Sequence, residues 1–147
     1  MNKKVNKKGF TLIELLIVVA ILGVLASVVL VGLGPVQKQG RDARRISDLR
    51  QVQNGLELYY NRNGSYPTGI TNWGQLANTL TRAGIGISNI PVDPTNNSTY
   101  FYRYGSDGTS YVLGARLEDT NNPRLRDDVD GNVLSVDCND PVYCIRL

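Results

Sequence analysis

Lys7-Lys8-Gly9-Phe10-Thr11-Leu12-Ile13-Glu14-Leu15-Leu16 introduces the long apolar segment on which the rest of the chain depends. Residues 15–34 carry no charge, and twenty apolar residues are about the length that a helix needs to cross a bilayer. Four lysines precede the segment within residues 3–8, and positive flanks stay on the cytoplasmic side. The sequence therefore predicts a single-pass protein of the cytoplasmic (inner) membrane with its N-terminus inside and its C-terminal part exported.

Glu14 does not fit a plain membrane anchor, because it lies at the start of the apolar run. A carboxylate near the bilayer centre costs roughly 2.5 to 3.5 kcal/mol and usually marks a function or a partner. Glu14 therefore needs a cation or a proton nearby. The alternative is a carboxylate close enough to the headgroups to reach water.

A basic leader ending in Gly9, followed by Phe10, Thr11, Glu14 and an apolar helix, resembles the class III signal of type IV pilins and type II secretion pseudopilins. The resemblance implies that a prepilin peptidase removes residues 1–9 by cutting between Gly9 and Phe10, and that Phe10 becomes the methylated N-terminus. It also implies that Glu14 is the assembly residue, which pairs with the N-terminal ammonium of a neighbouring subunit.

Physical chemistry supports this role for Glu14. After cleavage, the Phe10 amine and the Glu14 carboxylate are the only charges near the apolar end of the helix, and a filament would bury both. A lone buried charge is strongly unfavourable, whereas a matched pair between subunits satisfies both groups and fixes their register. Glu14 is thus expected to select correct docking more than to add net stability.

The helix is predicted to continue beyond the apolar segment. Apolar residues recur every three or four positions after Pro35, with arginines and aspartates between them. We expect residues 10–35 to form the transmembrane and assembly half of one spine helix, and residues 36–62 its amphipathic half, with Gly64 as a C-cap. Pro35 predicts a bend or a local unwinding near residues 32–35.

Residues 63–147 are predicted to form one exported globular domain. Asn72 caps a short helix that runs to Arg82, and the proline-rich residues 90–94 read as a loop. Residues 99–104 and 110–117 predict a β-hairpin, and residues 133–136 and 142–147 predict further short strands. The expected fold class is α+β, pilin-like, with the long spine helix packed on a small antiparallel sheet. Residues 59–68 and the segment at Pro91 resemble major pseudopilins.

Composition argues against catalysis. The 147 residues include no histidine, the commonest general base, so we expect no enzyme. The net charge of +3 depends on the leader, since its removal leaves 12 basic against 13 acidic side chains. Arg41, Arg44, Arg45 and Arg50 have the charge needed to contact DNA phosphates in an uptake pilus, but a solvated or intersubunit helix face is the better interpretation.

The C-terminal residues offer two features. Cys138 and Cys144 lie in the exported part, where disulfides persist, so one small bridge is expected. An acidic segment carries oxygen donors suited to Ca²⁺, namely Asp128, Asp130, Asn132 and Asp137. The spacing is not that of an EF-hand, and a solvated acidic turn is the alternative. Major pseudopilins hold calcium in a C-terminal loop, which adds weight, although that loop's sequence is not reproduced here.

Together these features predict a structural subunit of a type IV pilus-like filament, a homopolymer joined through its N-terminal helix. A major pseudopilin of a type II secretion system is the alternative within the family, and a membrane-tethered, calcium-dependent binding module is the alternative of another class. The resemblance implies a prepilin peptidase, an assembly ATPase and a platform membrane protein as partners. The filament would be extracellular or periplasmic.

Overall fold

The computed structural model describes residues 9–147, and within this range the side chains of residues 28–33 are not described. The predicted leader, residues 1–9, therefore lies outside the described residues except for Gly9. The chain divides into two compact units, Met1–Gln37 and Lys38–Leu147.

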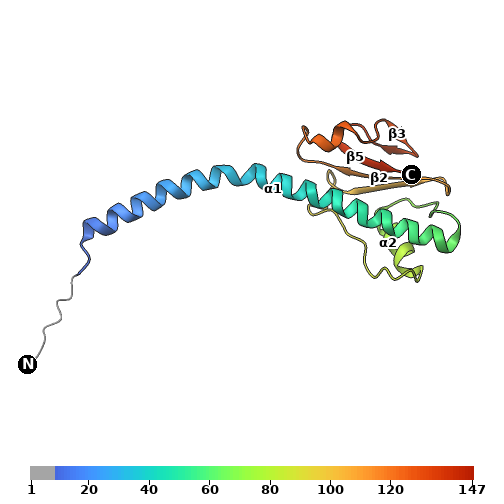
Figure 1. Ribbon diagram of the computed structural model, residues 1–147, viewed down its shortest axis with the longest axis horizontal. Helices are drawn as coiled ribbons and strands as arrows, with labels where there is room; N and C mark the ends of the chain where they lie inside the picture. The colour runs from blue at the N-terminus through green and yellow to red at the C-terminus, as the bar shows by residue number, and fades with distance from the viewer. Residues whose placement is uncertain (1–8) are drawn as a thin grey trace, which may run out of the picture. The chain divides into compact units, whose positions relative to one another are not determined.

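The longest element is helix α1, Leu12–Asn63, which belongs to both units (Figure 1). The backbone stays helical through Pro35, so the predicted unwinding is absent. Proline removes only one hydrogen bond of the helix, and the turns on either side keep theirs. The helix ends as predicted: Gly64 has a φ of 74°, and its N–H donates to the Tyr60 carbonyl oxygen at 2.7 Å.

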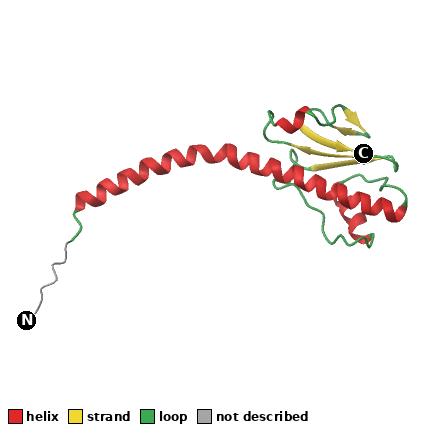
Figure 2. Ribbon diagram, in the orientation of Figure 1, coloured by secondary structure: helices red, strands yellow, loops and turns green. Residues whose placement is uncertain are grey.

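In the second unit, α1 packs on a small antiparallel sheet, as the α+β prediction required (Figure 2). The sheet has the order β1-β2-β5, with β1 at Tyr102–Ser106, β2 at Tyr111–Arg116 and β5 at Val142–Arg146. The helix contributes Leu49, Val52 and Leu56, all fully buried, to the core between helix and sheet. The apolar stripe of the amphipathic half is therefore covered, as expected.

The tyrosines of β1 belong to the core between the sheet and α1, as the packing interpretation predicted. The Tyr102 hydroxyl donates to Asp48 of α1 at 2.7 Å, and the Tyr104 hydroxyl donates to the Pro67 carbonyl oxygen at 2.8 Å. Tyr102 therefore packs on the spine, and Tyr104 packs against the same core cluster from the segment after α1.

Two predicted strands differ from the structure. The first strand of the hairpin begins at Tyr102, not at residue 99, and extends through Ser106. Residues 133–136 do not form one strand: residues 134–135 are a turn between β3, Asn132–Val133, and β4, Val136–Asp137, which pair as a separate two-stranded sheet. Leu134 and Ser135 adopt φ values of 47° and 65°. Leucine and serine rarely adopt this left-handed conformation, so the sequence does not predict the turn.

Helix α2, Trp73–Arg82, begins where the sequence predicts. The Asn72 side chain accepts a hydrogen bond from the Gln75 N–H at 3.0 Å, which satisfies a free amide of the first turn. The Trp73 indole donates to the Pro91 carbonyl oxygen at 2.8 Å and packs edge-on against Tyr102. Residues 90–94 form a loop, as expected, and a short 3-10 helix η1 occupies Pro123–Arg126.

Candidate functional site

The start of α1 carries the residues that the sequence singles out for processing and assembly. Gly9 and Phe10 precede the helix and are exposed, Phe10 by 84% of its surface. Thr11 donates to Glu14 Oε2 from its backbone N–H at 2.8 Å and from its hydroxyl at 2.7 Å. The Glu14 N–H lies 3.4 Å from the Thr11 hydroxyl and completes a reciprocal capping box.

This cap determines where the Glu14 carboxylate lies. Both Thr11 bonds end on Oε2, so Oε1 accepts no hydrogen bond from the residues that the structure describes. The carboxylate is held at the first turn of α1 by Thr11. An incoming cation can therefore reach Glu14 without any rearrangement of the helix end.

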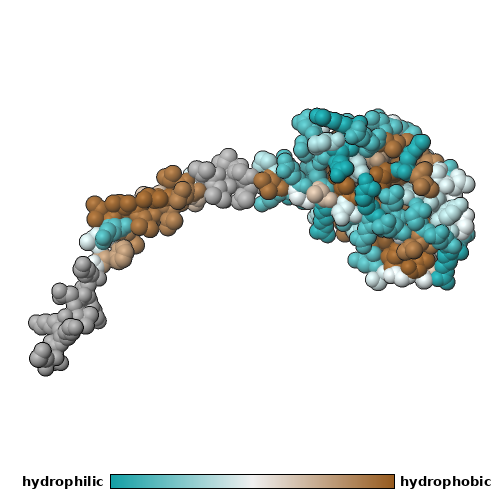
Figure 3. All heavy atoms as spheres, viewed as in Figure 1, coloured by the Kyte–Doolittle hydropathy of each residue, from teal (hydrophilic) through white to brown (hydrophobic). Residues whose placement is uncertain are grey.

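Large apolar side chains surround this helix end and lie open to solvent (Figure 3). Between residues 10 and 25 their exposed fractions run from 48% at Val18 to 84% at Phe10. Such a continuous apolar surface marks an interaction surface. Over the part of the chain that the structure describes, the helices lack the combination of length and apolarity that a membrane crossing requires. The predicted segment, residues 15–34, includes residues 28–33, whose side chains lie outside the described part.

Arg45 does not lie where the sequence predicts. It was expected on a solvated or intersubunit helix face, but it is fully buried in the second unit. Its guanidinium donates to Asp93 at 2.7 and 3.1 Å, to Asp42 at 2.8 Å and to Glu118 at 2.8 Å. Burial disfavours its charge, but these hydrogen bonds outweigh that effect and raise the pKa of Arg45.

The same cluster ties the helix to two loops. Asp42 accepts the backbone N–H groups of Glu118 and Asp119, both at 2.9 Å, just beyond β2. Glu118 also receives a bidentate pair from Arg41 at 2.6 and 2.7 Å, and the hydrogen bonds from Arg41 lower the pKa of Glu118 to about 2. We call Arg41, Asp42, Arg45, Asp93 and Glu118 the neck cluster.

The neck cluster argues against the DNA-contact alternative. Arg41 and Arg45 are committed to carboxylates of their own chain, so they do not present free charges to phosphates. Arg44 is exposed by 61% and lies 3.7 Å from Asp48, and Arg50 is exposed. The basic run in the sequence is therefore not one basic surface.

Near the C-terminus the structure gathers a group of carboxylates. Oxygens of Asp128, Asp130 and Asp140 all lie within 4.8 Å of one another. Asp128 Oδ2 accepts the Cys144 N–H at 2.7 Å, while its Oδ1 is shielded from solvent and accepts no hydrogen bond from the described residues. Burial, with the negative charges of Asp130 and Asp140, raises the pKa of Asp128. We call these three residues the acidic cluster.

Of the other predicted metal ligands, Asp137 is not part of the acidic cluster. Asp137 accepts hydrogen bonds from the backbone and side chain of Asn139, and these bonds lower the pKa of Asp137. Asn132 is exposed on β3. Asp140 was not among the predicted ligands, and the fold brings it back to Asp128 just before β5 begins.

Cys138 and Cys144 form a disulfide with a Cα–Cα distance of 5.7 Å. Both cysteines are buried with Val112, Val136 and Val142 on the face of the sheet away from α1. The bridge closes the segment that carries Asp140, so it supports one side of the acidic cluster.

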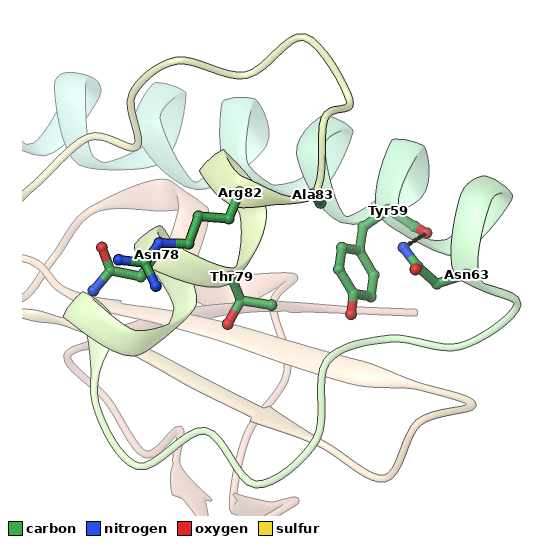
Figure 4. A pocket seen from close by; sticks show the side chains of 6 residues that line it. All are labelled: Tyr59, Asn63, Asn78, Thr79, Arg82 and Ala83. Atoms are coloured by element: carbon green, nitrogen blue, oxygen red, sulfur yellow. Dashed lines mark hydrogen bonds between the residues drawn. The ribbon is translucent and has the colours of Figure 1, made fainter.

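A polar hollow of about 330 Å³ lies between the end of α1 and α2 (Figure 4). Tyr59, Asn63, Thr79 and Arg82 line it, and the Asn63 side chain donates to the Tyr59 carbonyl oxygen at 2.9 Å. Arg82 is the only ionisable group there besides a tyrosine, so the hollow carries no acid-base pair.

Comparison with known proteins points to one family. The family model "Prokaryotic N-terminal methylation motif" matches residues 4–30. The chain is 32% identical to the type II secretion system core protein G of Vibrio cholerae, over 78% of this chain and 85% of that protein. It is also 32% identical to the protein of the same name in Escherichia coli, over 75% of this chain and 81% of that protein.

The type IV wide pilus major component of Thermus thermophilus is 43% identical over 42% of this chain and 47% of that protein. No solved structure gives a significant match.

Proposed function

The chain belongs to the family of type IV pilins and type II secretion major pseudopilins, and we infer from this premise that it is the repeating structural subunit of a helical filament. The observation that carries this function is the apolar surface of residues 10–25, which remains exposed in the single chain. Burial of such a surface among neighbouring helices releases about 25 cal/mol per Å². A role as structural subunit, and not as enzyme, follows the family.

We propose that a prepilin peptidase cuts between Gly9 and Phe10 and that Phe10 is then methylated. The exposure of both residues ahead of α1 supports this, because a peptidase needs an extended and accessible bond. The match of the methylation motif to residues 4–30 covers the same bond.

Glu14 is proposed to accept the Phe10 ammonium of the neighbouring subunit. In the single chain, Thr11 already holds the carboxylate in place, and Oε1 has no partner among the described residues. Both charges would leave water in the filament, where a mispaired carboxylate is strongly unfavourable. The pair would thus set the axial register between subunits.

Before assembly the chain is proposed to lie in the cytoplasmic membrane with its N-terminus inside. The uncharged residues 15–34 and the lysines ahead of them support this orientation. In this proposal the mature chain has three parts. Residues 10–35 form the membrane and assembly half of the spine helix, residues 36–62 its amphipathic half, and residues 63–147 the exported domain. An assembly ATPase and a platform membrane protein would extract the subunit into an extracellular or periplasmic filament.

Two filaments remain candidates. Two relatives named as type II secretion core proteins align with 78% and 75% of this chain, which favours a secretion pseudopilus over the type IV pilus that the sequence alone favours. The pilus component aligns with 42% of it. Deletion of the gene separates the two: a secretion subunit leaves exported enzymes behind in the periplasm, and a pilus subunit removes surface fibres or motility.

We also propose that the acidic cluster binds calcium. The buried and unpartnered Asp128 Oδ1 favours this over a solvated acidic turn, because a bare carboxylate oxygen without a donor costs free energy that a cation would offset. Asp128, Asp130 and Asp140 would hold the ion, which would neutralise their mutual repulsion.

Intact mass and N-terminal sequencing of sheared surface material test the filament function. A chain that begins at Phe10, carries one added methyl group and occurs in sheared fibres supports processing and polymerisation together. A chain that begins at Met1, or occurs only in membranes, would instead support the membrane-tethered binding module.

A further inference from the structure

The open edge of the three-stranded sheet lies at the bottom of a groove. Two hollows of about 410 and 330 Å³ follow strand β1, and both are lined by Thr71, Tyr104 and Ser135. One wall comes from residues 67–73, which precede and begin α2, and the other from residues 134–137 at the β3–β4 turn. We call this feature the β1 groove.

Strand β1 offers unpaired backbone groups to the groove. The Asp107 N–H donates to the Ser110 carbonyl oxygen, so Asp107 and Ser110 form a hydrogen-bonded pair at the end of the β1–β2 ladder. Hydrogen-bonded and non-hydrogen-bonded pairs alternate along an antiparallel ladder, so this pair fixes the type of every other pair. The register then makes the β1 residues Tyr102, Tyr104 and Ser106 members of non-hydrogen-bonded pairs. Their N–H and C=O groups point away from β2, towards the open edge.

The opposite strand agrees with this assignment. Tyr111, which faces Ser106, accepts a hydrogen bond from the Leu147 N–H, so its backbone is directed to β5 and not to β1. The Tyr102 hydroxyl is committed to Asp48 of α1, and the Tyr104 hydroxyl to the Pro67 carbonyl oxygen at one wall of the groove. Among the described residues, none forms a hydrogen bond with the outward-pointing backbone N–H and C=O groups of Tyr102, Tyr104 and Ser106. An edge of this kind is a template for an added strand.

Arg103 offers a hydrogen-bond donor that the described residues leave unused, although the carboxylate of Asp137, which lines the same hollow, attracts its positive charge. Its Nη1 is shielded from solvent and has no hydrogen-bond partner among the described residues. The guanidinium lies 4.6 Å from the centre of the Phe101 ring, and both residues line the larger hollow with Trp73. A carboxylate that entered the groove would give this donor a charge-assisted hydrogen bond, which is roughly twice as strong as a neutral one.

We propose that the β1 groove binds an extended, acidic peptide segment of a partner protein, which adds to β1 as a fourth strand and places a carboxylate on Arg103. Main-chain hydrogen bonds would give affinity, and Arg103 with the aromatic wall of Trp73 and Phe101 would give preference for an acidic residue beside an apolar one. This binding goes beyond filament formation and does not depend on it.

The test uses the full chain, ¹⁵N-labelled in detergent micelles, and the acetylated and amidated pentapeptide Thr-Val-Glu-Val-Thr. We expect the peptide to shift the amide resonances of Tyr102, Tyr104 and Ser106 and to slow their hydrogen exchange. The counterpart Thr-Val-Gln-Val-Thr should bind about tenfold more weakly, because it lacks the charge that Arg103 prefers.

Variants assign the effect to Arg103. Arg103→Gln should bring the affinities of the two peptides within about twofold of each other, whereas the exposed control Arg124→Gln should keep the tenfold difference. If Arg103→Gln fails to fold, the comparison of the two peptides on the unaltered chain decides alone. Equal binding of both peptides there, or no shift at the β1 amides, overturns the proposal. Edge shifts that follow protein concentration without peptide identify a second copy as the occupant and overturn it too.

Discussion

The guanidinium of Arg45 donates two hydrogen bonds to the carboxylate of Asp93, and both side chains are fully shielded from solvent. Arg45 lies on α1 and Asp93 in the loop of residues 90–94, which is 48 positions away in the chain. The loop is held in turn by its own carboxylate, since Asp93 accepts the Thr95 N–H at 2.8 Å. The exported unit is therefore built around a buried charge pair as well as an apolar core.

Replacement of Arg45 by methionine should be strongly destabilising. The change leaves the buried carboxylates of Asp42 and Asp93 without their cation, and loss of one partner of a buried pair costs about 3 to 5 kcal/mol. The free energy of unfolding can be measured with urea, using the fluorescence of the single tryptophan, Trp73. The exposed neighbour Arg44→Met is the control and should change it by less than about 0.5 kcal/mol. Equal effects of the two variants would contradict this account of the neck cluster.

The stability of the exported unit should fall in acid. Hydrogen bonds from Arg41 lower the pKa of Glu118 to about 2, against an ordinary value near 4.5, and the pKa of Asp93 is lowered by Arg45 against the opposing effect of burial. A carboxylate whose pKa is lower in the folded state contributes stability above its unfolded pKa and loses it as the pH falls towards the folded pKa. We expect a loss on the order of 2 kcal/mol between about pH 5 and pH 2 from Glu118. Urea unfolding of Glu118→Gln over this range should show a flatter pH profile, and an unchanged profile would refute the assignment.

Local sequence signals predicted the helices well because their causes are local. The three- and four-residue spacing of apolar side chains located α1, and the Asn72 side chain placed the start of α2. The capping residues act within one turn, so a short stretch of sequence contains them. The spine and its covered stripe could therefore be predicted without knowledge of the rest of the chain.

The burial of Arg45 could not be predicted in this way. An arginine between apolar positions resembles the solvated face of an amphipathic helix, and its partner Glu118 is 73 positions away. The turn at Leu134 and Ser135 was missed because neither residue is a glycine or an asparagine, the types that usually adopt positive φ. Asp140 joined the acidic cluster only through the return of the chain into β5.

Calcium should raise the thermal stability of the full chain, and EGTA should reverse the rise. Asp130→Asn removes one carboxylate of the acidic cluster and should weaken calcium binding by tenfold or more, as isothermal titration calorimetry would measure. Asp137→Asn is the matched control, because this exposed carboxylate is held by Asn139 outside the cluster. A larger effect of Asp137→Asn than of Asp130→Asn would restore the ligand set that the sequence suggested.

Two glycines should respond to alanine in opposite directions. At Gly105 a Cβ atom would lie far inside van der Waals contact with the Leu134 carbonyl oxygen, so β1 and the β3–β4 turn would have to separate. We expect Gly105→Ala to destabilise the exported unit by about 1 to 3 kcal/mol. Gly40 lies in α1 with open space around it, and Gly40→Ala should stabilise by up to about 1 kcal/mol. Urea unfolding monitored by Trp73 measures both, and a neutral Gly105→Ala would mean that the turn does not approach β1 so closely.

Glu14→Gln separates the cap of α1 from filament docking. Glutamine at this position can still accept the hydrogen bonds of Thr11, because a capping box works with either residue, so the helix start should be preserved. It cannot balance the ammonium of a neighbouring Phe10, so we expect the yield of sheared filaments to fall at least tenfold while the amount of subunit in membranes stays the same. Thr11→Ser keeps both the hydroxyl and the charge and should assemble normally. If Glu14→Gln assembles as well as the unaltered chain, the carboxylate serves only the cap, and the register of the filament must come from the apolar surface of residues 10–25 alone.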